Sequence, residues 1–107
     1  MNQQNENQMA GGLSTKRVAT RSEIKRGLKS LFKGQEFYME NSEDFDGHKG
    51  GIWMSGESET PNFDGVPVFD YYGQPDGGVS TTLRDWLHER GWFPEWHDAG
   101  TMFLWRI

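Results

Sequence analysis

Histidines and clustered carboxylates are the side chains whose types and spacing could bind a metal ion or move a proton. The three histidines are His48, His88 and His97; no two are four residues apart, and the helical zinc motif HExxH is absent. One acidic, glycine-containing segment places Asp44 and Asp46 just before His48. A divalent ion could be held there, although Asp-Gly pairs also form ordinary turns.

A second small cluster is expected on a strand near the C-terminus. Glu95 and His97 alternate along the chain, so they share one face of a strand, and we expect them to lie near Arg106. Such a group could hold a metal ion or a small acid, but an ordinary polar sheet face would have the same pattern. These two clusters carry the hypothesis of a small metal- or ligand-binding enzyme, which ranks third.

The motifs of common enzyme classes are missing. A calcium loop starting at Ser42 would place Lys49 and Trp53 where an apolar residue and a bidentate Glu belong. GxSxG, GxGxxG and GxxxxGK[ST] are absent. The chain has no cysteine, which excludes disulfides, thiol nucleophiles and Cys-ligated zinc. We therefore predict no catalytic residue, no metal site and no cofactor.

Acidic segments that carry aromatic residues indicate a protein-binding function. Trp and Tyr are favoured anchors at interfaces, and opposite charge speeds the encounter with a partner. The leading hypothesis is thus a small non-enzymatic interaction protein, such as an accessory or inhibitor protein; homodimerisation would also use exposed aromatics. The candidate partner-binding residues are Glu43, Asp44, Asp46, Glu57, Glu59, Asp64, Tyr71 and Tyr72.

The charge of the chain is unevenly distributed. Residues 1–34 carry a net charge of +5, whereas residues 35–107 carry −10. A basic helix face with a basic N-terminal arm could bind nucleic acid, which is the second hypothesis. The sequence pI of about 5.1 argues against a dedicated DNA-binding protein. The candidate nucleic-acid residues are Lys25, Arg26, Lys29 and Lys33, with Lys16, Arg17 and Arg21 adding to the arm.

Composition limits the class of protein. The longest apolar run, Met102–Trp105, is far shorter than the roughly 20 residues of a membrane helix. The first residues, MNQQNENQ, lack the apolar region of a secretory signal. Fifteen aromatic residues in 107 indicate a folded chain despite few aliphatic residues. We expect a soluble cytoplasmic protein with no membrane contact.

Hydrophobic periodicity predicts two helices. Thr20 and Glu23 fit a capping box, followed by apolar residues on one helix face up to a stop at Gly34. Ser80 caps a second helix from about Thr81 to Arg90. Residues 1–19 are polar and aperiodic, so we predict a disordered tail followed by a single domain over residues 20–107.

Alternation predicts five strands. Short links between them favour antiparallel pairing, so we predict an α+β fold in two layers, with two helices on one face of a mainly antiparallel sheet. The element order is α-β-β-β-α-β-β. The predicted strands are Glu36–Asn41, Gly51–Ser55, Val66–Tyr72, Trp92–His97 and Thr101–Arg106.

The last two strands are expected to form a hairpin around Ala99 and Gly100. A three-residue loop with Gly100 in the left-handed region would mix the two faces of the sheet. A two-residue loop would place four aromatic residues on one sheet face, which favours that register because one face must be buried. Whether the tryptophans among them are core or a stacking platform for bases or sugars is left open. The four residues are Trp92, Trp96, Phe103 and Trp105.

Overall fold

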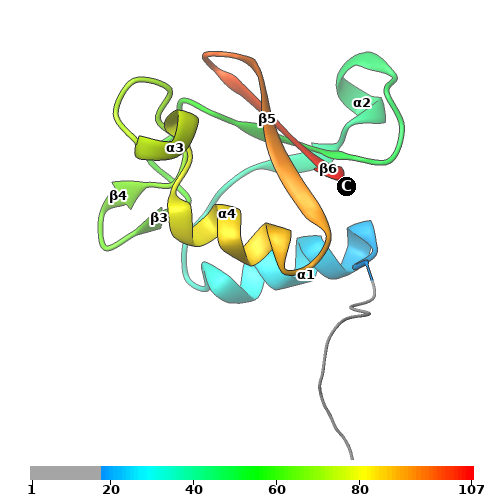
Figure 1. Ribbon diagram of the computed structural model, residues 1–107, viewed down its shortest axis with the longest axis horizontal. Helices are drawn as coiled ribbons and strands as arrows, with labels where there is room; N and C mark the ends of the chain where they lie inside the picture. Colours follow the sequence, from blue (N-terminus) through cyan, green and yellow to red (C-terminus); the bar gives the residue numbers. More distant parts are fainter. Residues whose placement is uncertain (1–17) are drawn as a thin grey trace, which may run out of the picture.

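The computed structural model describes residues 18–107, which form a mainly antiparallel α+β fold (Figure 1). The predicted class, with two helices on one face of the sheet, is confirmed. The helices are α1 (Arg21–Leu31), α2 (Glu43–Asp46), α3 (Pro75–Gly78) and α4 (Thr81–His88). The strands are β1 (Met39–Asn41), β2 (Ile52–Ser55), β3 (Asn62–Phe63), β4 (Val66–Pro67), β5 (Trp92–Asp98) and β6 (Thr101–Arg106).

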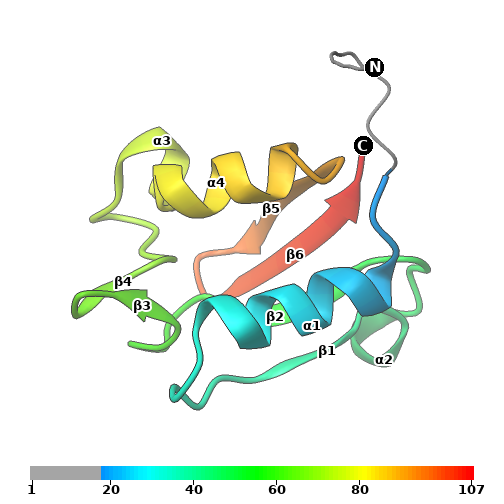
Figure 2. The same cartoon turned by 90° about the horizontal axis from the view of Figure 1, so that it is seen from below.

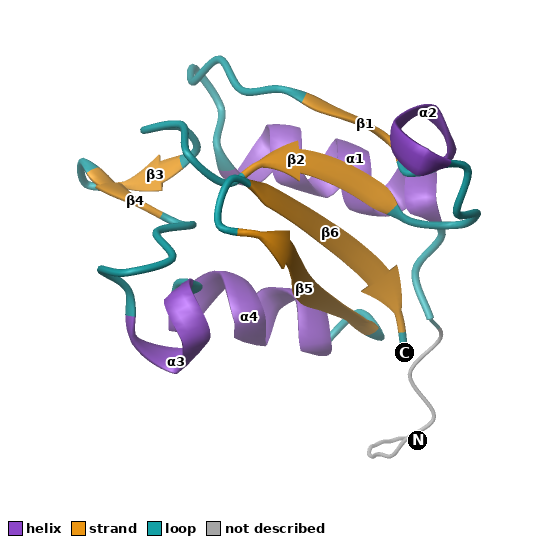
Figure 3. Ribbon diagram, turned by 90° about the horizontal axis from the view of Figure 1, so that it is seen from above, coloured by secondary structure: helices purple, strands orange, loops and turns teal. Residues whose placement is uncertain are grey.

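The main sheet has four strands in the order β1-β2-β6-β5, and all neighbours are antiparallel. The chain therefore builds two helix–hairpin units, α1-β1-β2 and α4-β5-β6, whose second strands pair at the centre of the sheet. Figures 2 and 3 show α1 and α4 on the same face, which we call the inner face. The opposite, outer face carries α2 (Figure 1). Residues 56–80 connect the two units.

Local sequence explains where α1 begins. The Thr20 hydroxyl accepts a hydrogen bond from the Glu23 backbone N–H at 3.2 Å, and the Glu23 carboxylate accepts one from the Thr20 N–H at 2.8 Å. This is the predicted capping box. Ile24, Leu28 and Phe32 then lie fully buried against the sheet. Burying this face offsets the entropy of ordering the helix.

The helix α4 follows the same logic. The Ser80 hydroxyl accepts a hydrogen bond from the Leu83 N–H at 3.4 Å, so Ser80 is the predicted N-cap. Leu83 and Leu87 are fully buried. The core of the inner face is completed by sheet residues that alternate along two neighbouring strands: Ile52, Met54, Met102 and Leu104.

The predicted third strand, Val66–Tyr72, is wrong in its length and in its place in the main sheet. Only Val66–Pro67 is a strand, and it pairs with β3 in a separate two-stranded sheet. Asp64 and Gly65 have φ of 53° and 84°, which closes a tight hairpin between β3 and β4. Pro67 has no N–H to donate to a ladder, so pairing ends there.

The closing hairpin has the predicted two-residue loop, but the prediction that its four aromatic residues share one sheet face is wrong. Asp98 pairs with Thr101, as a two-residue loop requires, but a bulge between Trp96 and Asp98 shifts the register by one residue. Trp96 therefore pairs with Met102, and Trp92 and Trp96 lie on the inner face. A one-residue shift moves alternate side chains to the other face of a sheet. Two of the four aromatic residues, Phe103 and Trp105, thus lie on the outer face.

The predicted tail lies outside the described residues, apart from Val18 and Ala19. The Ala19 N–H donates to the Arg90 carbonyl at 3.0 Å, and the Ala19 carbonyl accepts from the buried Trp92 indole at 2.8 Å. These bonds join the start of the described chain to the end of α4. None of the helices in residues 18–107 has the length and apolar character needed to cross a membrane.

Candidate binding surfaces

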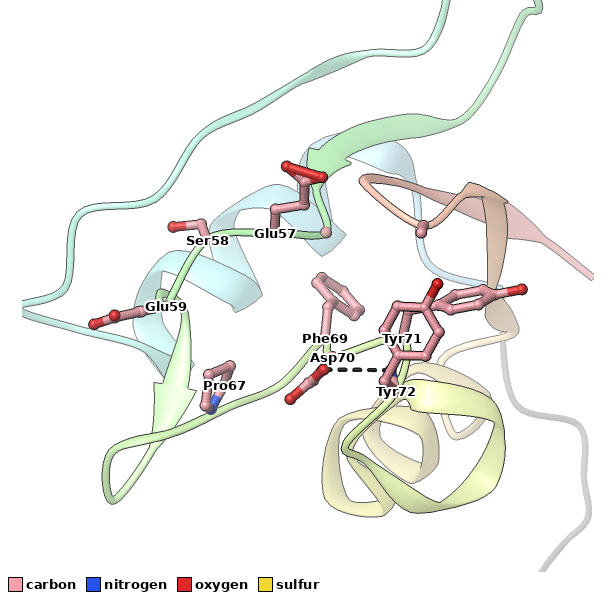
Figure 4. Close-up of a pocket in the computed structure, with 10 residues that line it drawn as sticks. Glu57, Ser58, Glu59, Pro67, Phe69, Asp70, Tyr71 and Tyr72 are labelled. Atoms are coloured by element: carbon pink, nitrogen blue, oxygen red, sulfur yellow. Dashed lines mark hydrogen bonds between the residues drawn. The ribbon is translucent and has the colours of Figure 1, made fainter.

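The segment between the two helix–hairpin units forms a pocket of about 310 Å³ (Figure 4). The loop after β2 supplies one wall, β4 and the chain after it supply the other, and Ala99 comes from the β5–β6 turn. Phe69 forms a bridge to Val79 just before α4, which holds the second wall against the core. We call this the tyrosine pocket. Its lining residues are Gly56, Glu57, Ser58, Glu59, Pro67, Phe69, Asp70, Tyr71, Tyr72 and Ala99.

A turn presents two tyrosine rings at the end of this pocket. The Asp70 carboxylate accepts hydrogen bonds from the Tyr72 N–H at 3.3 Å and the Gly73 N–H at 3.1 Å. The dashed line in Figure 4 marks a hydrogen bond between the drawn residues at this turn. The Gln74 amide donates to the Pro67 carbonyl at 2.6 Å and ties the turn to β4. The backbone around the tyrosines is thus held before any partner binds.

The two tyrosines differ in their support. The Tyr71 ring packs edge-on against Trp96, with centroids 5.2 Å apart, and the Trp96 indole donates to the Gly77 carbonyl at 2.6 Å. Tyr72 rests on Tyr71 alone among ring contacts in the described residues, at 5.1 Å, and is 88% exposed. Tyr71 is therefore anchored to the fold, whereas the Tyr72 ring is available for contact.

The carboxylates of the pocket lack basic neighbours. Glu57 and Glu59 are exposed, and within residues 18–107 neither carboxylate forms an ion pair. Among residues 18–107, no lysine or arginine lines the pocket. The Glu57 carboxylate lies against Gly100, because a Cβ added at Gly100 would be 2.6 Å from Glu57 Oε2. With Asp70, the pocket presents three acidic side chains beside two tyrosines.

The other predicted acidic residues lie elsewhere. Asp64 is exposed in the β3–β4 turn and does not line the tyrosine pocket. Glu43, on α2, pairs with Arg21 at 2.6 Å, and Arg21 also donates to the Gly51 carbonyl at 3.1 Å. The hydrogen bond from Arg21 is the main reason that the pKa of Glu43 is lowered to about 2. Glu43 thus holds the start of α1 to the loop around α2.

Asp44 and Asp46 have different neighbours and do not form one site. Asp44 is exposed and lines a small cavity of about 80 Å³ with Glu40, Phe45 and Trp53. Asp46 accepts hydrogen bonds from the His48 ring at 2.8 Å and from the His48 N–H at 3.0 Å. These bonds hold the pKa of Asp46 below its usual range. The predicted Asp44–Asp46–His48 cluster is thus only partly assembled.

A second pocket, of about 330 Å³, lies on the outer face of β5 and β6, and we call it the outer-face pocket. It brings Glu95 and His97 beside Asp46 and His48. Arg106 is not among its lining residues, since it pairs with Trp92 at the other end of the hairpin; the expected proximity to His97 is wrong. The lining residues are Asp46, His48, Glu95, Trp96, His97, Phe103 and Trp105.

No family model, curated protein or solved structure matches the chain. A function for this chain therefore rests on its own surfaces. Within residues 18–107, no group of three or more His, Asp or Glu side chains is placed to hold a metal ion.

The basic residues of α1 are divided between packing and solvent. The Lys25 ammonium donates to the Asn41 side chain at 2.7 Å and docks the helix on β1. Arg26, Lys29 and Lys33 are exposed. Of the basic arm, Arg21 is used in the ion pair with Glu43, and Lys16 and Arg17 lie outside the described residues.

Sequence reasoning missed the outer-face pocket as a unit. It placed Glu95 and His97 on one strand face but put Phe103 and Trp105 with the inner-face tryptophans. No local signal revealed it, because the turn has the expected two residues and alternation cannot show an inserted residue. A bulge would have turned both rings toward Glu95 and His97.

Proposed function

We propose that this chain is a non-enzymatic interaction protein, and that its tyrosine pocket receives a basic segment of a protein partner. The main support is that Glu57, Glu59 and Asp70 line a pocket to which none of the described lysines and arginines contributes. A carboxylate without a basic neighbour gains a charge-assisted hydrogen bond when a guanidinium or ammonium group arrives. An accessory or inhibitor protein would act in this way.

The tyrosines support the same proposal. Tyr72 is 88% exposed, and covering a large aromatic ring with a partner makes the free energy of binding more favourable. The turn at Asp70 fixes its backbone, so little additional ordering is needed on binding. A basic segment that crosses the pocket would cover Tyr72 and approach Glu57.

Long-range charge favours the encounter. Residues 35–107 carry a net charge of −10, whereas the basic excess is confined to residues 1–34. A surface of one sign raises the association rate of an oppositely charged partner, and added salt reduces this rate. We include a cytoplasmic location in the proposal, because a chain without cysteine depends on no oxidising compartment.

A charge-reversal pair tests the proposal. The variant Glu57→Lys with Glu59→Lys is compared with Asp85→Lys with Glu89→Lys, which changes the net charge equally at exposed sites outside the pocket. Each chain is used to capture proteins from source-cell lysate after nuclease treatment. We expect a stoichiometric partner that the control retains and the pocket variant loses. Equal capture by both variants would reject the tyrosine pocket as the binding site.

A further inference from the structure

The outer-face pocket combines flat rings with carboxylates. Phe103 and Trp105 stack with centroids 5.0 Å apart and an interplanar angle of 26°. The rings of His97 and His48 stand nearly perpendicular to them, His97 against Phe103 at 5.6 Å and His48 against Trp105 at 6.5 Å. Ring contacts therefore surround the pocket from β5, from β6 and from the loop after α2.

Packing beneath the rings fixes their positions. A Cβ at Gly51 would overlap the six-membered ring of Trp105 and the Leu104 carbonyl, so this glycine lets Trp105 lie close to β2. Phe45, on α2, packs edge-on against Phe103 with centroids 5.4 Å apart. The Trp105 indole donates to the Glu95 carboxylate at 2.9 Å. The pocket is thus shaped before a ligand enters it.

Two carboxylates reach this pocket and keep acceptor capacity. Glu95 uses one oxygen for the Trp105 indole, and its second oxygen has no hydrogen-bond partner in the described residues. Within the described residues the Asp46 carboxylate is bonded only to His48, and a carboxylate can accept about four hydrogen bonds. In the part of the chain that the structure describes, no lysine or arginine lines the pocket. The site therefore offers negative charge beside aromatic rings.

We propose that the outer-face pocket binds the guanidinium group of an arginine side chain. A guanidinium is planar, stacks on aromatic rings, and carries five N–H donors that match carboxylate acceptors. An ammonium group of lysine presents a compact, strongly hydrated charge that stacks less well. Phe103 is only 3% exposed and packs against Trp105, so the half-buried Trp105 ring is the one open to stacking. This ring beside Glu95 and Asp46 fits the guanidinium better than an ammonium group. This inference adds a second site and does not rest on the tyrosine pocket.

The probe is N-acetyl-arginine amide, titrated against the full chain while the indole N–H signals are followed by NMR. The neutral isostere N-acetyl-citrulline amide and the lysine analogue are titrated in parallel. We expect a saturable shift of the Trp105 indole signal, assigned from Trp105→Phe, with the arginine probe and at least a fivefold weaker response with the other two. Equal shifts with citrulline would overturn charge recognition, and equal shifts with lysine would overturn the guanidinium assignment.

Variants locate the site. Glu95→Gln keeps an acceptor for the Trp105 indole but removes the charge, and we expect it to weaken arginine binding at least threefold. Asp85→Asn is the matched control, because Asp85 is exposed on α4 and lines neither pocket. Unchanged binding in Glu95→Gln, or no saturable shift in the unmodified chain, would overturn the proposal. The Glu57 and Glu59 variants are expected to bind the probe normally, so failure of one site is distinguishable from failure of the other.

Discussion

Gly27 on α1 lies directly against the Trp86 ring on α4: a Cβ at Gly27 would be 2.6 Å from Cζ2 of Trp86. A glycine inside a helix lowers the stability of that helix by about 1 kcal/mol relative to alanine, so the sequence alone indicates that Gly27 weakens α1. The contact gives the physical reason for the residue. It lets the two helices that cover the inner face approach each other closely.

We therefore predict that Gly27→Ala destabilises the fold despite its better helix propensity. Overpacking costs about 1–3 kcal/mol, against a propensity gain of about 1 kcal/mol, so we expect a net loss of roughly 1 kcal/mol. Urea unfolding measures the free energy. Ser30→Ala, at an exposed site on the same helix, is the control and should not destabilise. A Gly27→Ala chain more stable than the parent would contradict the close contact.

The ion pair between Arg21 and Glu43 predicts a loss of stability in acid. The pKa of Glu43 falls from 4.5 to about 2 in the folded chain, so its contribution is complete above the ordinary pKa and disappears as the pH falls toward 2. Glu43→Gln should flatten the dependence of unfolding free energy on pH between about 4.5 and 2. Glu89→Gln, at an exposed site, should leave it unchanged. An unaltered slope in Glu43→Gln would show that the pair contributes nothing.

The two tyrosines of the pocket should separate stability from binding. Tyr72→Ala should change the unfolding free energy by less than about 0.5 kcal/mol, because the ring is 88% exposed. Tyr71→Ala should cost about 1 kcal/mol, because its ring packs on Trp96. Urea unfolding and partner capture are measured on both chains. The proposal requires that Tyr72→Ala reduces capture; full capture by that variant would count against it.

The exposed basic face of α1 is expected to be dispensable for partner capture. Arg26→Glu combined with Lys29→Glu should leave capture unchanged, since neither residue lines the tyrosine pocket. Binding of the unmodified chain to single-stranded and double-stranded DNA is measured over a salt series. Tight binding that falls steeply with salt and is abolished by these substitutions would favour the nucleic-acid hypothesis instead.

Local patterns predicted α1 and α4 well, because their caps and apolar faces are encoded within a few neighbouring residues, but they did not predict the short α2 and α3. Thr20 with Glu23, and Ser80 with Leu83, form the expected bonds. Alternation also predicted the side chains that the main sheet buries. In β2, for example, Ile52 is buried on the inner face, whereas its neighbour Trp53 is half-buried on the outer face. These features depend only on nearby sequence.

The remaining features depend on contacts between distant segments. A single bulge before Asp98 places Phe103 and Trp105 on the sheet face opposite to Trp92 and Trp96. Alternation cannot reveal such an inserted residue. Pairing of Glu43 with Arg21 joins residues that are 22 positions apart. For the tyrosine pocket, sequence supplied Glu57, Glu59, Tyr71 and Tyr72 but not their common location. That location follows from the packing of residues 56–80 between the two helix–hairpin units.

Photocrosslinking from the position of Tyr72 tests the central proposal most directly. Benzoylphenylalanine replaces Tyr72 in one chain and Tyr38, a 53% exposed tyrosine outside the pocket, in the control. After irradiation in source cells, mass spectrometry identifies the joined peptide. We expect one protein joined at position 72 through a segment rich in lysine or arginine, and no such product from position 38. A product from position 38 alone, an acidic joined segment, or crosslinks to nucleic acid would contradict it.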